Sequence, residues 1–479
     1  MGRLEEAKDW IAENLKVDAF DYMSRFELVL SEEDNTEILS EMNCFMRNFQ
    51  ENYLMTARDY ADAGCYEEAI SILEQCTKAY PLLSYYKGYY YAKLGNTEKC
   101  ISEYKEADAC NPIYCFPNKL EDIAVLKEAI RVLPKGAKAY YYLGNLYYDK
   151  LQFEQAIGLW EKSTALDNSY PTVHRNLSIA YYNKQGNLQK AKTEMEKAFA
   201  LDETDSRVFL ELDQLYKKLG VPFTERLERY EKHMDIVAER DDVMLEFVTL
   251  YNLTGMHKKA YDTIMSHTFR PWEGAEGRIS GQYKIALLEM AKEKIAQSQY
   301  KQAEELLQKA MIYPHNLGEG KLEGTKDNHL YYYLGIVKKM LGSQAEAAEC
   351  FEKARIGENE PAGVLYYYDQ PADMILYKGL ANLELGNTKE AYACFNKLMD
   401  YGERHLNDEM KDDFFAVSLP DFLIFEEDMN VRNKAHCFYL MGLAKLGMGE
   451  KQKASEYFDE ALQLDHNHQN CYIYKKMAV

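Results

Sequence analysis

Residues 140–160 read YYYLGNLYYDKLQFEQAIGLW, and the spacing of small and large side chains in this stretch decides the fold. Large residues surround Gly144 at helical spacing, and a second apolar period places Ala156 four residues before Trp160. Small residues let two helices approach closely, and an aromatic ring then fills the space beyond the contact. The stretch therefore predicts two helices that pack against each other as an antiparallel pair.

The full pattern, large-x2-Leu-Gly-x2-Tyr followed by Ala-x3-aromatic, resembles the tetratricopeptide repeat, a helix–turn–helix unit of about 34 residues. The same register recurs along the chain, and we expect about nine or ten repeats. The clearest further copies have their small, small and large residues at Gly88, Cys100 and Tyr104; Ser178, Ala191 and Met195; Gly335, Ala347 and Phe351; Gly379, Ala391 and Phe395; and Gly442, Ala454 and Phe458. The sequence thus predicts an all-α, right-handed superhelical solenoid of antiparallel helix pairs with loop insertions.

The register also suggests three parts. Residues 1–114 are expected to form an array that begins in the middle of a repeat, because residues 2–11 read as a second helix without its first. Residues 115–240 are expected to form a central array with one extra helix. Residues 241–479 are expected to hold the remaining repeats, the longer insertions and a polar capping helix, with residues 466–471 as a solvated tail.

Composition limits the class of protein. Among 479 residues there are only 11 prolines and 26 glycines, which favours helices, and 40 tyrosines. The net charge of −21 argues against binding to nucleic acid or to anionic membranes, because both require clustered basic residues. The ten cysteines include no Cys-x-x-Cys pair. Together with acidic residues near Met1 and no long apolar run, this predicts a cytoplasmic protein that does not enter the membrane.

Three insertions interrupt the repeats. They are CFPNKLEDIAVLKEAIRVLP at 115–134, RPWEGAEGR at 270–278, and a polar stretch at 314–329. Insertions of this kind usually lie on one face of a solenoid, and that face is often the binding face.

The phrases CFPNKLED, DQLYKKLG, RPWEGAEGR, HNLGEGK and YYYLGNLYYDK, in their order along the chain, resemble one region of certain large bacterial tetratricopeptide proteins. In that family the repeats follow galactose-mutarotase-like β-domains of unknown function. The resemblance implies a helical module that works beside a carbohydrate-type β-domain. That β-domain is not part of these 479 residues, and no catalytic residue is carried over.

The insertions supply the predicted partner-binding residues. They are Asn118, Arg270, Trp272, Glu273, Glu276, Arg278, His315 and Asn316. Trp272 is the strongest of these candidates, because an exposed spacer has no use for a large apolar ring. Two alternatives stay open at this point. In the first, Glu273 and Glu276 act as a general acid and base. In the second, the loop only fills space in the fold as a structural plug.

A second candidate surface is a groove lined by the first helices of the repeats. If Gly144 occupies the eighth position of its repeat, then the fifth, ninth and twelfth positions face the concave side. The predicted groove residues are Tyr85, Tyr89, Tyr141, Asn145, Tyr148, Arg175, Tyr182, Tyr332 and Tyr439. Tyrosines could stack there on a sugar or hold a peptide, or could simply fill the space between repeats.

No motif points to a catalytic or cofactor chemistry. GEGKLEG at 318–324 lacks the dinucleotide spacing, and His466, His468 and Cys471 do not share one helical face. We therefore expect no cofactor and no metal. The function predicted from sequence is a non-catalytic scaffold that binds a protein partner, and the resemblance implies that this partner is the carbohydrate-type β-domain. The alternatives are a helical subunit of a carbohydrate-active enzyme and a peptide-binding adaptor that uses the tyrosine groove.

Overall fold

A computed structural model of the chain describes residues 3–270, 272, 275–361, 370–410 and 424–478. The regular elements in this part of the chain are twenty-six α-helices and one 3-10 turn, with no strand among them. The predicted all-α fold of antiparallel helix pairs is confirmed. None of the described helices is both long enough and apolar enough to cross a membrane.

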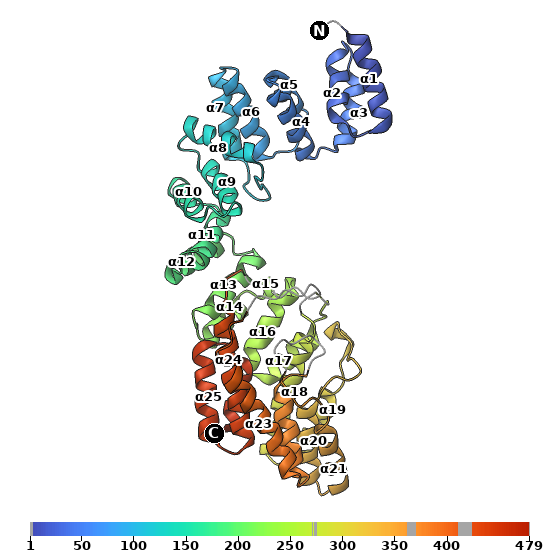
Figure 1. Cartoon of the computed structure of the whole chain (residues 1–479), viewed down its shortest axis with the longest axis vertical. Coiled ribbons are helices and arrows are strands. Elements are labelled where there is room, and N and C mark those ends of the chain that lie inside the picture. The colour runs from blue at the N-terminus through green and yellow to red at the C-terminus, as the bar shows by residue number, and fades with distance from the viewer. Residues whose placement is uncertain (1–2, 271, 273–274, 362–369, 411–423, 479) are drawn as a thin grey trace. The chain divides into compact units, whose positions relative to one another are not determined.

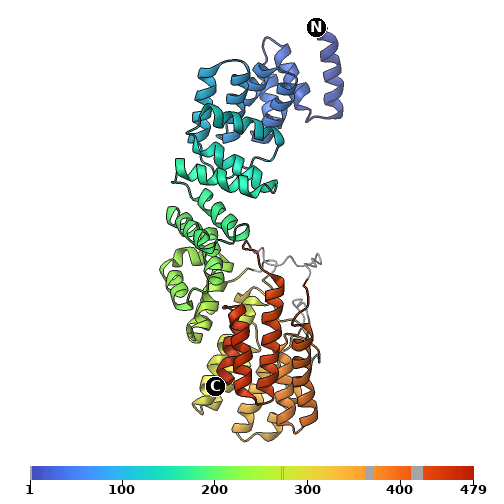
Figure 2. The ribbon, with the colours of Figure 1, turned by 60° about the vertical axis from the view of Figure 1, so that its left-hand side comes forward.

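The chain divides into two compact units, which we call unit 1 (residues 1–202) and unit 2 (residues 203–479). The boundary between the units lies between two helix pairs and not at an insertion, and the three parts suggested by the sequence stay a prediction. In both units, consecutive helices lie side by side in pairs (Figure 1 and Figure 2).

The helices of unit 1 are α1 (Leu4–Val17), α2 (Tyr22–Ser31), α3 (Thr36–Met46), α4 (Gln50–Asp62), α5 (Tyr66–Leu73), α6 (Pro81–Lys93), α7 (Thr97–Ala109), α8 (Leu120–Val132), α9 (Ala137–Asp149), α10 (Phe153–Leu166), α11 (Pro171–Asn183) and α12 (Leu188–Leu201). The first helices of unit 2 are α13 (Ser206–Lys218), α14 (Phe223–Lys232), α15 (Met234–Glu239), α16 (Asp241–Leu253), α17 (His257–Ser266), α18 (Arg278–Ala296) and α19 (Tyr300–Ala310). They are followed by η1 (His315–Leu317), α20 (Asn328–Met340), α21 (Gln344–Ala354), α22 (Asp373–Glu384), α23 (Thr388–His405), α24 (Met429–Gly447), α25 (Lys451–Leu464) and α26 (Gln469–Ala478).

The packing inside each pair follows the predicted register. A Cβ added to Gly144 in α9 would lie 2.5 Å from the Trp160 ring in α10, and one added to Gly88 in α6 would lie 2.5 Å from the Tyr104 ring in α7. The same overlap occurs in unit 2 between Gly335 and Phe351, Gly379 and Phe395, and Gly442 and Phe458. Glycine is therefore required at these positions because the facing aromatic ring occupies the place of a side chain.

Local signals fix several helix ends. Asn96 and Asn187 accept hydrogen bonds at 3.1 Å from the backbone N–H groups three residues later, which caps the second helices α7 and α12. Pro81 and Pro171 are the first residues of α6 and α11, where the missing N–H of proline costs no helical hydrogen bond. These signals make the pair boundaries legible in the sequence.

The predicted polar cap is α26, and one side of it is buried. Cys471, Tyr474 and Ala478 lie on that side at spacings of three and four residues, and Cys471 is 0% exposed. The prediction of a solvated tail at residues 466–471 is therefore wrong. The reason is that a short apolar period stands inside a polar-looking string, and packing against distant helices buries it.

Candidate functional site

The first insertion, in unit 1, presents an apolar surface that we call the 113–120 loop. Ile113, Tyr114, Phe116 and Leu120 are 45%, 82%, 65% and 70% exposed, whereas Cys115 between them is 1% exposed. Large apolar side chains gathered on a short exposed segment are typical of an interaction site, because their exposure to water otherwise costs free energy.

The 113–120 loop is fixed at both of its ends. The backbone N–H groups of Asn118 and Lys119 both donate to one carboxylate oxygen of Asp122 at 2.9 Å, and the Tyr86 hydroxyl donates to the other at 2.6 Å. Before the loop, the Lys138 ammonium donates to the Cys110 carbonyl at 2.7 Å. Because Asp122 is buried and joins the loop to α6, the loop backbone that carries the apolar side chains is fixed to the fold.

The interior of the loop is anchored by Cys115. Burial raises the pKa of the Cys115 thiol to about 12, so it is a neutral, packed group. Its neighbour Tyr114 has a φ of 60°, a left-handed conformation that is unfavourable for a residue with a bulky side chain. Backbone strain of this kind often accompanies functional sites, since it persists only where the surroundings enforce it.

The other two insertions both belong to unit 2, and the structure brings them together. We call residues 267–278 and 315–327 the joined loops. The Phe269 N–H donates to the Asn316 carbonyl at 2.9 Å, and the Asn316 amide donates to the carbonyls of Ile264 and His267 at 2.7 and 2.8 Å. The Asn316 side-chain amide therefore donates its hydrogen bonds within unit 2.

Two carboxylates complete the joined loops. Glu319 accepts hydrogen bonds from the N–H groups of Gly277 and Ser280 at 2.9 and 3.0 Å. Asp241, the first residue of α16, accepts from the Arg270 N–H at 2.7 Å and contacts His267 Nε2 at 2.7 Å. The backbone groups of Phe269, Arg270 and Gly277 are thus bonded within unit 2.

The predicted partner-binding side chains fall into three groups. Trp272 is half-buried, and Asn118, Arg270, Glu276, Arg278 and His315 are exposed. Glu273 lies outside the described residues, so the proposed acid–base pair with Glu276 has no described geometry. Arg278 lies 3.8 Å from Glu246 of α16. Partner binding by these residues stays a prediction.

The groove prediction needs correction at two positions in unit 1. Tyr85 and Tyr141 are only 1% and 5% exposed, because their rings fill the space between neighbouring helix pairs. Asn145 Oδ1 accepts from Trp160 Nε1 at 3.0 Å and from Asn176 Nδ2 at 3.1 Å, so it helps to hold α9, α10 and α11 together. The predicted groove residues of unit 1 that are half-exposed are Tyr89, Asn145, Tyr148, Arg175 and Tyr182.

In unit 2 the predicted groove positions face α26. The Tyr439 ring lies 6.1 Å from Tyr474, and the Tyr332 ring lies 5.7 Å from Tyr377, which itself lies 6.2 Å from Tyr474. Tyr439 is buried and Tyr332 is half-buried. The first-helix face of unit 2 is therefore already covered by a helix of the same chain.

Sequence reasoning missed the carboxylates that organise these sites. Asp122 stands at the third position of α8, where an acid commonly caps a helix start, so a signal for it existed. Glu319 and Asp241 stand in stretches with several acids, and nothing local distinguishes them. No group of three potential metal-ligating side chains occurs among the described residues.

The helix pairs and their insertions define a helical-repeat protein. Tetratricopeptide repeats are present in it: models described as TPR repeat or tetratricopeptide repeat match residues 54–112, 144–185 and 435–468. Such repeats indicate a scaffold for protein–protein interaction.

Solved structures similar to this chain include three tetratricopeptide proteins. TTC0263, a thermophilic TPR protein of Thermus thermophilus, is 18% identical, with 42% of this chain and 98% of that chain covered and a TM-score of 0.24. YrrB, described as a TPR protein with an unusual peptide-binding site, is 14% identical, with 41% and 95% covered and a TM-score of 0.20. The TPR domain of P58(IPK) is 12% identical, with 95% and 96% covered and a TM-score of 0.26.

Proposed function

We propose that this protein is a non-catalytic scaffold that binds a protein partner through the 113–120 loop of unit 1. The observation that carries the proposal is the exposure of Tyr114, Phe116 and Leu120 on a loop whose Cys115 is buried. Aromatic and aliphatic side chains held rigidly at a surface are the residues that dominate binding energy in protein interfaces, because ordering them on binding costs little.

The partner that we propose is a galactose-mutarotase-like β-domain carried on a separate chain. The support is the resemblance of CFPNKLED at 115–122, which contains most of the 113–120 loop, to the repeat region of proteins that contain such a domain. An apolar pocket on that domain would receive Phe116 and Leu120, and Asn118, which is exposed, lies between them in the sequence.

The test is a binding titration with a separately produced β-domain of this type. We expect Phe116→Ala combined with Leu120→Ala to weaken binding at least tenfold, which corresponds to about 1.4 kcal/mol. Leu151→Ala is the matched control, since Leu151 is also 70% exposed in unit 1 but lies in the turn between α9 and α10. Helix content by circular dichroism should stay unchanged in all three proteins, because the substituted side chains are exposed.

Equal binding by the double variant and the wild type would overturn the proposal. Loss of binding on substitution of Tyr148 and Tyr182, with no effect of the loop variant, would instead favour the peptide-binding adaptor. Sugar turnover that appears only when both proteins are mixed, and that depends on Glu276, would favour the subunit of a carbohydrate-active enzyme.

A further inference from the structure

The first-helix face of unit 2 is covered by α26, which contacts helices from several different pairs. Gln282 in α18 and Gln469 exchange hydrogen bonds of 2.7 and 3.1 Å, and the Tyr333 hydroxyl in α20 lies 3.7 Å from the sulfur of Met477. Contacts with α22 and α24 follow along the same helix. A helix that only capped the last pair would touch α24 and α25 alone.

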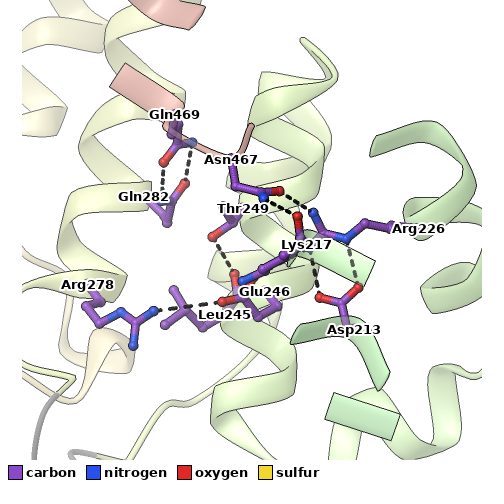
Figure 3. A network of polar contacts seen from close by, with 10 residues as sticks. All are labelled: Asp213, Lys217, Arg226, Leu245, Glu246, Thr249, Arg278, Gln282, Asn467 and Gln469. Carbon is purple, nitrogen blue, oxygen red and sulfur yellow. Dashed lines mark hydrogen bonds and ion pairs between the residues drawn. The ribbon is translucent and has the colours of Figure 1, made fainter. Parts of the chain in front are cut away.

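The beginning of α26 is held by an ion pair between α13 and α14 (Figure 3). Arg226 and Asp213 form a two-pronged contact of 2.9 and 2.8 Å, and both side chains are buried. Asn467, just before α26, accepts from Arg226 Nη1 at 3.0 Å and donates to the Lys217 carbonyl at 2.9 Å. The Phe223 ring of α14 also lies 5.2 Å from the Tyr472 ring.

The middle of α26 is held by Tyr474. Its hydroxyl donates to an Asp373 carboxylate oxygen at 2.7 Å, and its ring lies between those of Tyr377 and Tyr439. Cys471 lies one turn before it on the same side, and the opposite side carries the exposed Lys476. Apolar contacts repeated every three or four residues along one side are how an amphipathic helix binds in a groove.

The connection between α25 and α26 consists of residues 465–468. A linker this short gives the attached helix an effective concentration of about millimolar or more at its own groove. The chain's own α26 therefore keeps α26 of another molecule out of that groove. The groove is nevertheless complementary to this sequence, whichever chain supplies it.

We propose that the first-helix face of unit 2 is a helix-binding groove, that α26 is its intramolecular ligand, and that α26 of a second copy of this chain takes the groove when the first is released. The second copy is the partner whose fit is known, because every contact given above would be repeated. Reciprocal exchange would place each α26 in the other chain's groove, which is a self-complementary arrangement.

The experiment uses the whole chain and a fluorescent peptide of residues 465–478, which stands for α26 of another molecule. In the release variant, Asn467→Ala and Tyr474→Ala together remove the anchors of the chain's own helix. We expect this variant to bind the peptide saturably in fluorescence anisotropy, and the wild type to bind it at least tenfold more weakly. A peptide carrying Tyr474→Ala should bind the release variant at least tenfold more weakly than the native peptide.

The matched control is Lys476→Ala in the whole chain. Lys476 is an exposed residue of the same helix, so this variant should exclude the peptide as the wild type does. A release variant that keeps its helix content but does not bind the native peptide would overturn the proposal.

If the release variant unfolds, hydrogen exchange of the wild type decides the question. Exchange of the α26 amides at least tenfold faster than those of α22 and α24 would support a ligand that leaves its groove. Equal exchange in all three helices would show that α26 is an inseparable part of the core, and the proposal would fail.

Discussion

Unit 1 and unit 2 are built from the same kind of helix pair, but their insertions differ in which groups are exposed and which are bonded within the fold. In unit 1 the insertion between α7 and α8 buries Cys115 and turns Tyr114 and Phe116 outward. In unit 2 the two insertions bond to each other through Glu319 and Asn316, and a further helix covers the first-helix face. Backbone groups are bonded within the fold in both units, so the difference teaches that outward-facing apolar side chains are what make an insertion an open surface.

The largest expected effect concerns the ion pair that closes unit 2. Asp213→Ala removes the two-pronged counter-ion of the buried Arg226 and leaves only Glu246 at 4.0 Å, and we expect a loss of about 3–5 kcal/mol in the free energy of unfolding. Urea unfolding followed by circular dichroism measures it. Glu128→Ala is the control in unit 1, because its partner Arg131 is exposed and such pairs contribute roughly 0–1 kcal/mol. Equal losses of unfolding free energy in Asp213→Ala and Glu128→Ala would show that the buried pair of unit 2 contributes no more than the exposed pair of unit 1.

The same pair predicts a pH dependence for unit 2. Burial alone would raise the pKa of Asp213, but the adjacent Arg226 guanidinium outweighs burial and holds the pKa below its usual value. The stabilisation is therefore complete above the unfolded pKa of about 3.9 and is lost as the pH falls through the lower folded pKa. We expect the acid-induced loss of stability below about pH 4 to be smaller in Asp213→Asn than in the wild type. Identical acid profiles would contradict the prediction.

A smaller effect is expected where glycine faces an aromatic ring. Gly144→Ala in α9 forces a Cβ against Trp160, and overpacking of this kind costs about 1–3 kcal/mol. Gly158→Ala in α10 is the matched control, because nothing lies within 4 Å of the added Cβ. That control should stabilise unit 1 by about 0.5–1 kcal/mol, since alanine favours a helix over glycine. Thermal unfolding compares the two variants. If both substitutions changed the stability in the same direction, the close contact of Gly144 with Trp160 would not be what fixes the packing of α9 on α10.

A local effect is expected in the joined loops of unit 2. Glu319→Ala removes the acceptor of the Gly277 and Ser280 N–H groups, at a cost of about 1–2 kcal/mol. Glu323→Ala changes an exposed glutamate of the same segment and should be neutral within about 0.5 kcal/mol. Hydrogen exchange should become faster at residues 277–280 in the first variant only. Unchanged exchange there would mean that Glu319 does not join the two insertions.

The smallest change is chemical and leaves the fold intact. Cys44 is exposed, whereas Cys115 in unit 1 and Cys471 in unit 2 are buried, and burial raises the pKa of both buried thiols. Because the thiolate is the reactive form, a thiol reagent should modify Cys44 first, Cys471 only when α26 leaves its groove, and Cys115 only after unfolding. Mass spectrometry of the labelled peptides measures the order. Early labelling of Cys471 with Cys115 protected would show that α26 leaves unit 2 readily.

The sequence predicted the pairs better than it predicted the surfaces. Gly144 with Trp160 and Gly442 with Phe458 were correctly paired, because a close helix contact constrains a few nearby residue types. The places of the insertions were also recognised. Which side chains of an insertion are buried and which are exposed could not be predicted. The burial of Cys115 beside the exposed Phe116 depends on contacts with α6 and α8.

The position of α26 could not be predicted for a related reason. Arg226 and Asn467 lie in stretches that read as ordinary polar helix surface, and only the tertiary fold brings them together. The predicted groove positions follow from a repeat register that assumes an open first-helix face. Tyr439 occupies one of these positions, yet it is buried beneath α26.

The bond between Arg226 and Asn467 spans 241 residues and has a consequence for biosynthesis. Repeat arrays usually fold from local contacts and can start before the chain is finished. Unit 2 cannot complete its buried ion network until α26 has left the ribosome, which at about 5–20 residues per second is roughly 10–50 s after Arg226 was added. During that interval the apolar first-helix face is uncovered in the nascent chain, so chaperone demand should fall mainly on unit 2 while unit 1 is already folded.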